Sequence, residues 1–94
     1  MTVIKFPNKD PDEYLDYTLD WSLRVPSTDQ IIASTWSTPT SGGLTVASTS
    51  YATFTTTVWL STGTIGITYQ LTNRITTVFG RIMDQTCRLK IRAK

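Results

Sequence analysis

Residues that could carry out catalysis are scarce in this chain of 94 residues, which has no histidine and a single cysteine, Cys87. Without histidine, the many serines and threonines have no neutral-pH base to activate them, and the lysines lie near the chain ends. Asp16 and Asp20 resemble the acid pair of a glycosidase. Four residues along a strand would put their Cα atoms about 13 Å apart, beyond either working separation. The sequence therefore predicts no catalytic site and no enzymatic activity.

Two other stretches have the composition of a ligand site without its spacing. Asp10, Asp12 and Glu13 form a carboxylate cluster, but this cluster lacks the glycine and the ligand spacing of a calcium loop. Gly42-Gly43 is followed neither by a lysine at phosphate-loop spacing nor by a helix pattern. We therefore expect no metal site and no cofactor.

Charge is distributed unevenly, although the net charge is only +2. All acidic residues except Asp84 lie at or before Asp29, and the segment from Gln30 to Asn73 carries no charge. The C-terminal part is basic, with Arg74, Arg81, Arg88, Lys90, Arg92 and Lys94. This asymmetry suits pairing of the first and last strands, head-to-tail contacts between copies, or ordinary solvated surface.

A nucleic-acid-binding surface is one interpretation of the basic end. Arg88, Lys90 and Arg92 alternate and could follow phosphates, with Trp59 as a stacking platform. The acidic first third would repel a polyanion, and no known motif is present. Nucleic acid is therefore an unlikely partner and stays an alternative.

The segment Ile65–Phe79 is predicted to be one long strand and the element around which the fold is organised. Its apolar residues alternate with polar ones and would line one face, namely Ile65, Ile67, Tyr69, Leu71, Ile75 and Phe79. Cys87, Leu89 and Ile91 continue this alternation on a return strand, where Cys87 is expected to be a buried apolar side chain. Tyr69 early in the long strand has the position of a tyrosine corner.

Further strands are predicted at 14–21, 30–36, 44–49 and 53–60, with a turn over 39–43 and a short edge strand or docking arm at 3–6. In 30–36, Ile32, Ser34 and Trp36 would share a face. Trp21 and Trp36 are expected in the core on opposing sheets, and Trp59 is expected to point outward. About seven strands, with turn signals roughly every 8 to 12 residues, favour an all-β fold of the sandwich type. We expect one domain over 1–94 with an N-terminal arm (about 1–13), no transmembrane helix and no signal peptide.

A family resemblance rests on ordered motifs along almost the whole chain. These are Phe6-Pro7, Lys9-Asp10-Pro11-Asp12-Glu13, Leu15-Asp16-Tyr17, Asp20-Trp21-Ser22, Thr57-Val58-Trp59-Leu60-Ser61, Tyr69, Thr72-Asn73-Arg74-Ile75-Thr76-Thr77 and Gly80-Arg81. They resemble a family of small structural proteins of tailed bacteriophages, the fibre–tail adaptors. The chain departs from the family pattern at Ser61-Thr62-Gly63, where a glycine pair is expected, and at Val78-Phe79.

The resemblance implies an immunoglobulin-like antiparallel β-sandwich that is assembled in the host bacterial cytoplasm and becomes part of the virion. It implies an adaptor or accessory protein at the head–tail connector or tail-fibre junction, with capsid decoration or a head fibre as the alternative. The partners would be connector, tail, fibre or capsid subunits and further copies of the chain, with no membrane. The residues predicted to form protein interfaces are Ile4, Phe6, Asp10, Asp12, Glu13, Trp59, Arg74, Arg81, Arg88, Lys90 and Arg92.

Overall fold

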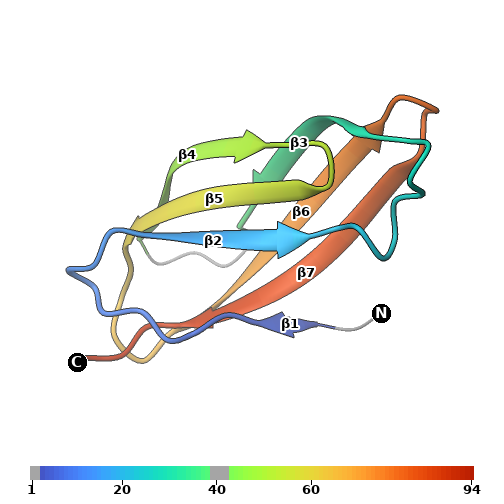
Figure 1. Cartoon of the computed structure of the whole chain (residues 1–94). Coiled ribbons are helices and arrows are strands. Elements are labelled where there is room, and N and C mark those ends of the chain that lie inside the picture. Colours follow the sequence, from blue (N-terminus) through green and yellow to red (C-terminus); the bar gives the residue numbers. More distant parts are fainter. Residues whose placement is uncertain (1–2, 39–42) are drawn as a thin grey trace.

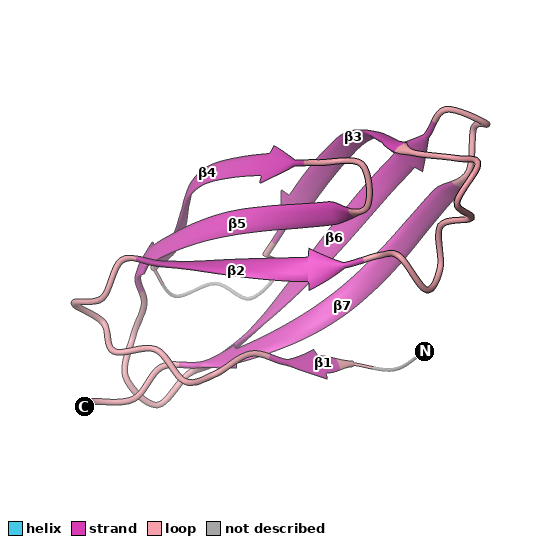
Figure 2. Ribbon diagram, in the orientation of Figure 1, coloured by secondary structure: helices cyan, strands magenta, loops and turns pink. Residues whose placement is uncertain are grey.

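Two β-sheets pack face to face in the computed structural model, which describes residues 3–38 and 43–94 (Figure 1). These residues form seven strands and no helix, and so no helix that could span a membrane. One sheet has the order β1-β7-β6-β3 and the other the order β2-β5-β4 (Figure 2). The strands are β1 (Ile4–Lys5), β2 (Leu15–Asp20), β3 (Ile31–Ser37), β4 (Leu44–Tyr51), β5 (Thr55–Thr62), β6 (Thr68–Thr77) and β7 (Ile82–Lys90). Of the turn predicted over 39–43, all but Gly43 lies outside the described residues.

The strand order confirms the immunoglobulin-like sandwich. The sheet β2-β5-β4 has the order of immunoglobulin strands B, E and D, and β7-β6-β3 has the order of G, F and C. One pairing corrects the prediction of an antiparallel fold, because β1 runs parallel to β7, with Ile4 beside Cys87 and Lys5 beside Arg88. A parallel pair needs a long crossover connection, and the entire chain between the two strands provides it.

The predicted long strand is shorter than expected and is confirmed only in its middle. Tyr69, Leu71 and Ile75 are fully buried on β6, but Ile65 and Phe79 are 58% and 63% exposed in the turns beyond its ends. The alternation continues through these turns in the sequence, but Gly66 (φ 88°) and Gly80 (φ 82°) break the strand. The return strand β7 is confirmed, and it pairs antiparallel with β6 over its whole length.

The predicted tyrosine corner is present at the start of β6. The Tyr69 ring is fully buried, and its hydroxyl oxygen accepts a hydrogen bond from the Thr64 backbone N–H at 2.9 Å. This bond joins β6 to the loop that precedes it. The corner therefore fixes how the chain passes from the β2-β5-β4 sheet to the other sheet.

The two tryptophans lie on opposing sheets as predicted, but they are buried to different extents. Trp21, which follows β2, is 2% exposed, and its Nε1 donates to Thr56 Oγ1 at 3.0 Å and to Asn73 Oδ1 at 3.2 Å. Trp36 on β3 is only partly buried, and its Nε1 has no hydrogen-bond partner among the described residues. Trp21 is therefore the central core residue, and Trp36 packs at the margin of the core.

The predicted face of β3 is wrong at its start. Ile31 is 3% exposed whereas Ile32 is 47% exposed, although Ile32 was expected to share the inner face with Trp36. A β-bulge between Ile31 and Ala33 shifts the register against β6 and changes the phase of the alternation. The strands β4 and β5 also differ slightly from prediction, because β4 extends to Tyr51 and β5 begins at Thr55.

The site where the family pattern expects a glycine pair has an unusual backbone. Thr62 and Gly63 have φ angles of 62° and 107°, in the left-handed region that favours glycine. A Cβ on Gly63 would lie 2.8 Å from side-chain atoms of Ile91. Thr62 thus holds the conformation of the missing glycine, while Gly63 is required both by its backbone angle and by the space available.

Candidate protein-interaction surfaces

The N-terminal arm is part of this molecule's own sheet. The Phe6 backbone N–H donates to the Arg88 carbonyl at 2.9 Å, and the Phe6 ring stacks on Tyr17 at 4.6 Å. Phe6 is 5% exposed and packs in the core of this chain, and its role at an interface stays a prediction. Ile4 is 37% exposed and could contact a neighbouring protein.

The acidic loop after the arm is held by the basic C-terminus of the same chain. Asp10 Oδ2 accepts the Lys94 backbone N–H at 2.9 Å, and Glu13 Oε1 lies 2.9 Å from Lys94 Nζ. The pKa values of both carboxyls are lowered, mainly by backbone N–H donors within the loop. The Asp12 N–H donates to the Asp10 carboxylate, and the Asp10 N–H donates to the Glu13 carboxylate. Asp12 is exposed. The acidic loop and the basic C-terminus therefore pair with each other within one chain.

A buried lysine in this loop was not found from the sequence. Lys9 is 0% exposed, and its Nζ donates to the carbonyl oxygens of Thr62 at 2.7 Å and Asp10 at 2.9 Å. Burial lowers its pKa, which the nearby Glu13 and Asp10 carboxylates partly oppose. The residue bridges to Ile91 beyond the end of β7, a pairing that no local sequence pattern indicates. Lys9 therefore supports the fold at the end of the sandwich where the acidic loop meets the C-terminus.

Two of the basic residues predicted to form interfaces are paired within the chain. Arg74 forms a bidentate salt bridge with Asp84. Its Nε donates to Oδ1 at 2.8 Å and its Nη2 donates to Oδ2 at 3.0 Å. Arg81 Nη1 lies 2.6 Å from Oδ2 of the buried Asp29. These contacts account for both charges, so neither arginine needs an external partner.

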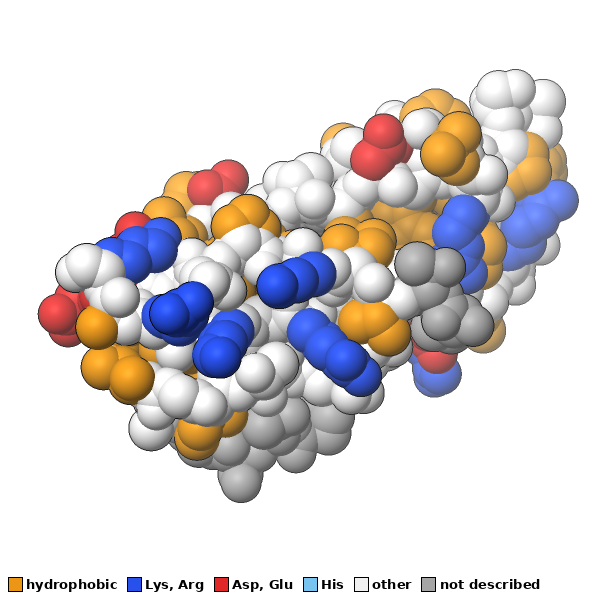
Figure 3. Space-filling view, turned by 90° about the horizontal axis from the view of Figure 1, so that it is seen from below, with side chains coloured by type: hydrophobic (Ala, Val, Ile, Leu, Met, Phe, Trp, Pro, Cys, Tyr) orange, Lys and Arg blue, Asp and Glu red, His pale blue; other side chains and the backbone are white. Residues whose placement is uncertain are grey.

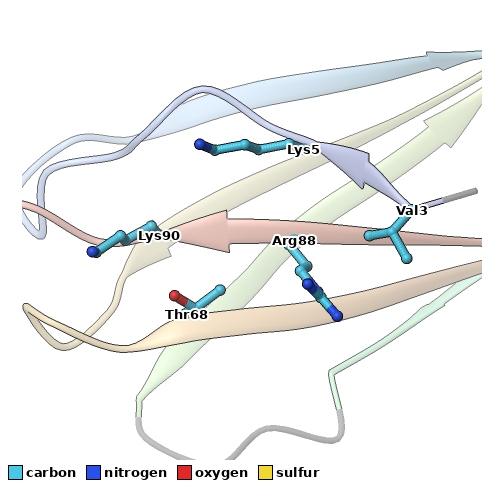
Figure 4. A pocket seen from close by; sticks show the side chains of 5 residues that line it. All are labelled: Val3, Lys5, Thr68, Arg88 and Lys90. Carbon is cyan, nitrogen blue, oxygen red and sulfur yellow. The ribbon is translucent and has the colours of Figure 1, made fainter.

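The remaining predicted basic residues gather on the outer face of β1, β7 and β6, which we call the basic face. Arg88 and Lys90 on β7 lie beside Lys5 on β1, and a row of lysine and arginine side chains crosses this side of the molecule (Figure 3). Lys5, Arg88, Lys90 and Arg92 have no acidic partner among the described residues. A hollow of about 340 Å³ on the basic face is lined by Val3, Lys5, Thr68, Arg88 and Lys90 (Figure 4).

The opposite outer face has different chemistry, and we call it the acidic face. Asp16 and Asp20 are exposed along β2, and Asp16 is the cross-strand neighbour of Trp59 on β5. Trp59 points outward as predicted, and its ring centroid lies 5.2 Å from that of Tyr14, which is 57% exposed. This face therefore combines two carboxylates with an accessible aromatic pair.

A third surface, also missed, lies at the end of the sandwich formed by the β2–β3 and β6–β7 connections. Large apolar side chains are exposed there: Leu23 (99%), Ile32 (47%), Val78 (52%), Phe79 (63%) and Ile82 (64%). We call this surface the loop end. The alternation of apolar and polar residues predicts that Ile32 and Phe79 face the core, and for this reason their exposure was missed. A turn signal at Phe79-Gly80 was the one available indication that Phe79 lies outside the strand.

Neither a metal-binding cluster nor a reactive cysteine is found among the residues that the structure describes. In residues 3–38 and 43–94, no three His, Cys, Asp or Glu side chains gather closely enough to hold a metal ion. Cys87 is fully buried as predicted, and burial raises the pKa of its thiol to about 12. A thiol with this pKa is not a reactive nucleophile at neutral pH.

Comparison with known proteins gives one family. Residues 9–90 match a family model described as podophage GP4 fiber-tail adaptor protein gp77. No curated protein matches the chain. The matched segment begins at Lys9 and ends at Lys90, so it covers both sheets except β1.

Proposed function

Because the chain belongs to the podophage GP4 fibre–tail adaptor protein gp77 family, a family of phage structural proteins rather than of enzymes, we propose that it joins fibre to tail by direct protein contact. The proposed partners are a tail protein and a fibre protein in the virion. The chain would assemble with them in the host cytoplasm and act without catalysis or cofactor.

The observation that carries this proposal is the loop end. Monomeric proteins rarely expose clustered large apolar side chains, and such clusters often mark protein-binding sites. Leu23, Val78 and Phe79 come from two separate connections and are each at least half exposed. Binding energy at protein interfaces is concentrated in a few apolar or aromatic side chains, and Phe79 has this character. The loop end therefore suits an apolar pocket of a tail or fibre subunit.

The backbone of the loop end is already held in place before any partner binds. Asp29 Oδ1 accepts the Phe79 N–H at 3.2 Å, and the Gln30 carbonyl accepts the Val78 N–H at 3.0 Å. The Arg81 backbone N–H donates to Thr77 Oγ1 at 3.1 Å, and the Arg81 guanidinium lies 5.7 Å from the centre of the Phe79 ring. A loop that is ordered in advance loses less conformational entropy on binding.

The proposal is tested by replacing the exposed apolar residues without disturbing the fold. A Leu23→Ser, Val78→Ser, Phe79→Ser triple variant should keep its thermal midpoint within a few degrees, because exposed side chains contribute little to stability. Supplied to a phage that lacks the wild-type gene, this variant should be absent from purified virions, and the particles should lack fibres. The matched control is Ile65→Ser, which removes a similarly exposed apolar side chain at the opposite end and should be incorporated normally.

Copy number separates the adaptor from the alternative of capsid decoration. An adaptor should be present in a small number of copies set by the rotational symmetry of the tail, whereas a decoration protein should approach the number of capsid subunits. Quantitative mass spectrometry of purified virions measures this ratio. A capsid-like ratio, or normal incorporation of the triple variant, would overturn the proposal.

A further inference from the structure

The two outer faces of the sandwich carry opposite charge and lie on different sheets. The basic face presents Lys5, Arg88 and Lys90 on the sheet β1-β7-β6-β3. The acidic face presents Asp16 and Asp20 on the sheet β2-β5-β4. The segment from Gln30 to Asn73 contains no charged residue, so β4 and β5 add no positive charge to the acidic face. The basic face and the acidic face of one molecule thus point in opposite directions.

We propose that the basic face of one copy binds the acidic face of a second copy, so that the chain associates head to tail. A second copy fits this surface because the charged residues are separated by uncharged ones on both β2 and β7. Asp16 and Asp20 are four residues apart on β2 and therefore span about 13 Å, and Arg88 and Lys90 alternate along β7, with Arg92 two residues beyond its end. The hollow of Figure 4, which Lys5, Arg88 and Lys90 line, can receive a carboxylate of the second copy.

Aromatic contact adds to the ion pairs. Asp16 and Trp59 are cross-strand neighbours, and Tyr14 extends the aromatic surface at 5.2 Å from Trp59. An arginine that approaches Asp16 can place its guanidinium over one of these rings, a favourable cation–π arrangement. Arg88 is the best candidate for this contact, because it is exposed in the middle of the basic face.

The charges also determine which faces can meet. Contact between two basic faces or two acidic faces would bring like charges together, so a symmetric face-to-face dimer is disfavoured. The remaining arrangement joins different faces, and each bound copy leaves one face open for the next. Such an interface gives a ring if the rotation between copies closes and a filament if it does not.

The test uses the complete chain without any other phage protein, and it is therefore independent of whether the loop end binds tail or fibre. Sedimentation equilibrium at roughly 20 mM salt should show an average mass that rises with concentration, and about 0.5 M salt should return the monomer. Asp16→Asn with Asp20→Asn should raise the dissociation constant roughly tenfold, as should Arg88→Gln with Lys90→Gln. An asparagine in place of Asp20 can still accept the Ser22 N–H that the carboxylate accepts at 2.8 Å, so the turn after β2 is retained.

Mixing the two variants gives the decisive result, because each keeps one intact face. The mixture should form 1:1 pairs at concentrations at which the wild type associates, whereas either variant alone should be monomeric there because its own association is roughly tenfold weaker. Arg24→Gln, which removes one positive charge away from both faces, should leave association unchanged.

Four results would overturn the proposal. These are a wild-type chain that stays monomeric up to about 1 mM in low salt, association that strengthens with salt, a variant mixture that forms no pairs, and binding of short duplex DNA by a chain that does not self-associate. The last result would assign the basic face to nucleic acid.

Discussion

The two ends of the sandwich each bury one charged residue, but the two charges have opposite sign and different surroundings. At the end where the acidic loop meets the C-terminus, Lys9 is fully buried, and its ammonium group donates to two carbonyl oxygens. At the loop end, Asp29 is 4% exposed and accepts from backbone N–H groups and from Arg81. The first end has a buried cation with neutral partners, and the second has a buried anion with a cationic partner.

This difference explains what each end presents to solvent. Around Lys9, the acidic loop and the C-terminus satisfy one another, so this end is completed by its own chain. Around Asp29, the hydrogen bonds fix the backbone of the β6–β7 turn but leave the side chains of Val78 and Phe79 exposed. The buried Lys9 therefore lies at an end whose polar groups pair within the chain, whereas the buried Asp29 supports the apolar surface of the loop end.

The largest expected effect comes from the core that both ends share. Trp21→Ala should lower the free energy of unfolding by about 3–5 kcal/mol, because it removes a buried indole together with its bonds to Thr56 and Asn73. Trp36→Ala should cost clearly less, since that ring is only partly buried and its N–H has no partner to lose among the described residues. Urea unfolding of both variants measures the difference, and equal losses would contradict the assignment of Trp21 as the central residue.

A smaller loss of stability is expected at the end of the sandwich that contains Lys9. Lys9→Met keeps the aliphatic volume but removes the donor from the Thr62 and Asp10 carbonyl oxygens, which should cost roughly 1–3 kcal/mol. The matched control is Lys5→Met, because Lys5 is exposed on β1, and its loss should stay within about 0.5 kcal/mol. If the two variants are equally stable, the buried ammonium contributes nothing to closure of this end.

Much of the fold could be predicted from alternation alone, and the reason is physical. Strands β2, β5, β6 and β7 each have one buried face, so Leu19, Val58, Leu71 and Leu89 recur at the expected positions. The prediction failed where a local pattern does not determine the surroundings. Ile32 faces solvent because of a bulge, and Phe79 does so because β6 ends at Thr77 and Phe79 lies in the turn before Gly80.

The interaction surfaces were less accessible to sequence reasoning. The backbone N–H groups of Phe6 and Lys9 donate to carbonyls of β7, more than 80 residues away along the chain, so neither position shows a local sign of burial. Arg74 and Arg81 were predicted to bind a neighbour, yet their carboxylate partners lie within the same chain. Arg88, Lys90 and Arg92 have no such partner among the described residues, and their role at an interface stays a prediction.

The last expected effect concerns Asp29, whose contribution to stability is present at neutral pH and changes only in acid. Burial tends to raise the pKa of this carboxyl, but donors from Thr77, Gln30, Arg81 and Phe79 outweigh burial and lower the pKa from 3.8 to about 2. The folded state thus binds this proton less readily than the unfolded state. The stability that Asp29 contributes is therefore complete above about pH 4 and is lost as the pH falls towards 2.

Asp29→Asn should flatten this dependence between pH 4 and pH 2, because the replacement does not titrate in this range. Thermal unfolding across that interval measures the change, with the exposed Asp16→Asn as a control that should keep the wild-type slope. In the same acid range, fluorescence from a probe attached beside Phe79 should report loosening of the β6–β7 turn in the wild type. If the turn stays fixed while overall stability falls, Asp29 does not hold the loop end, and its ordering must come from the turn itself.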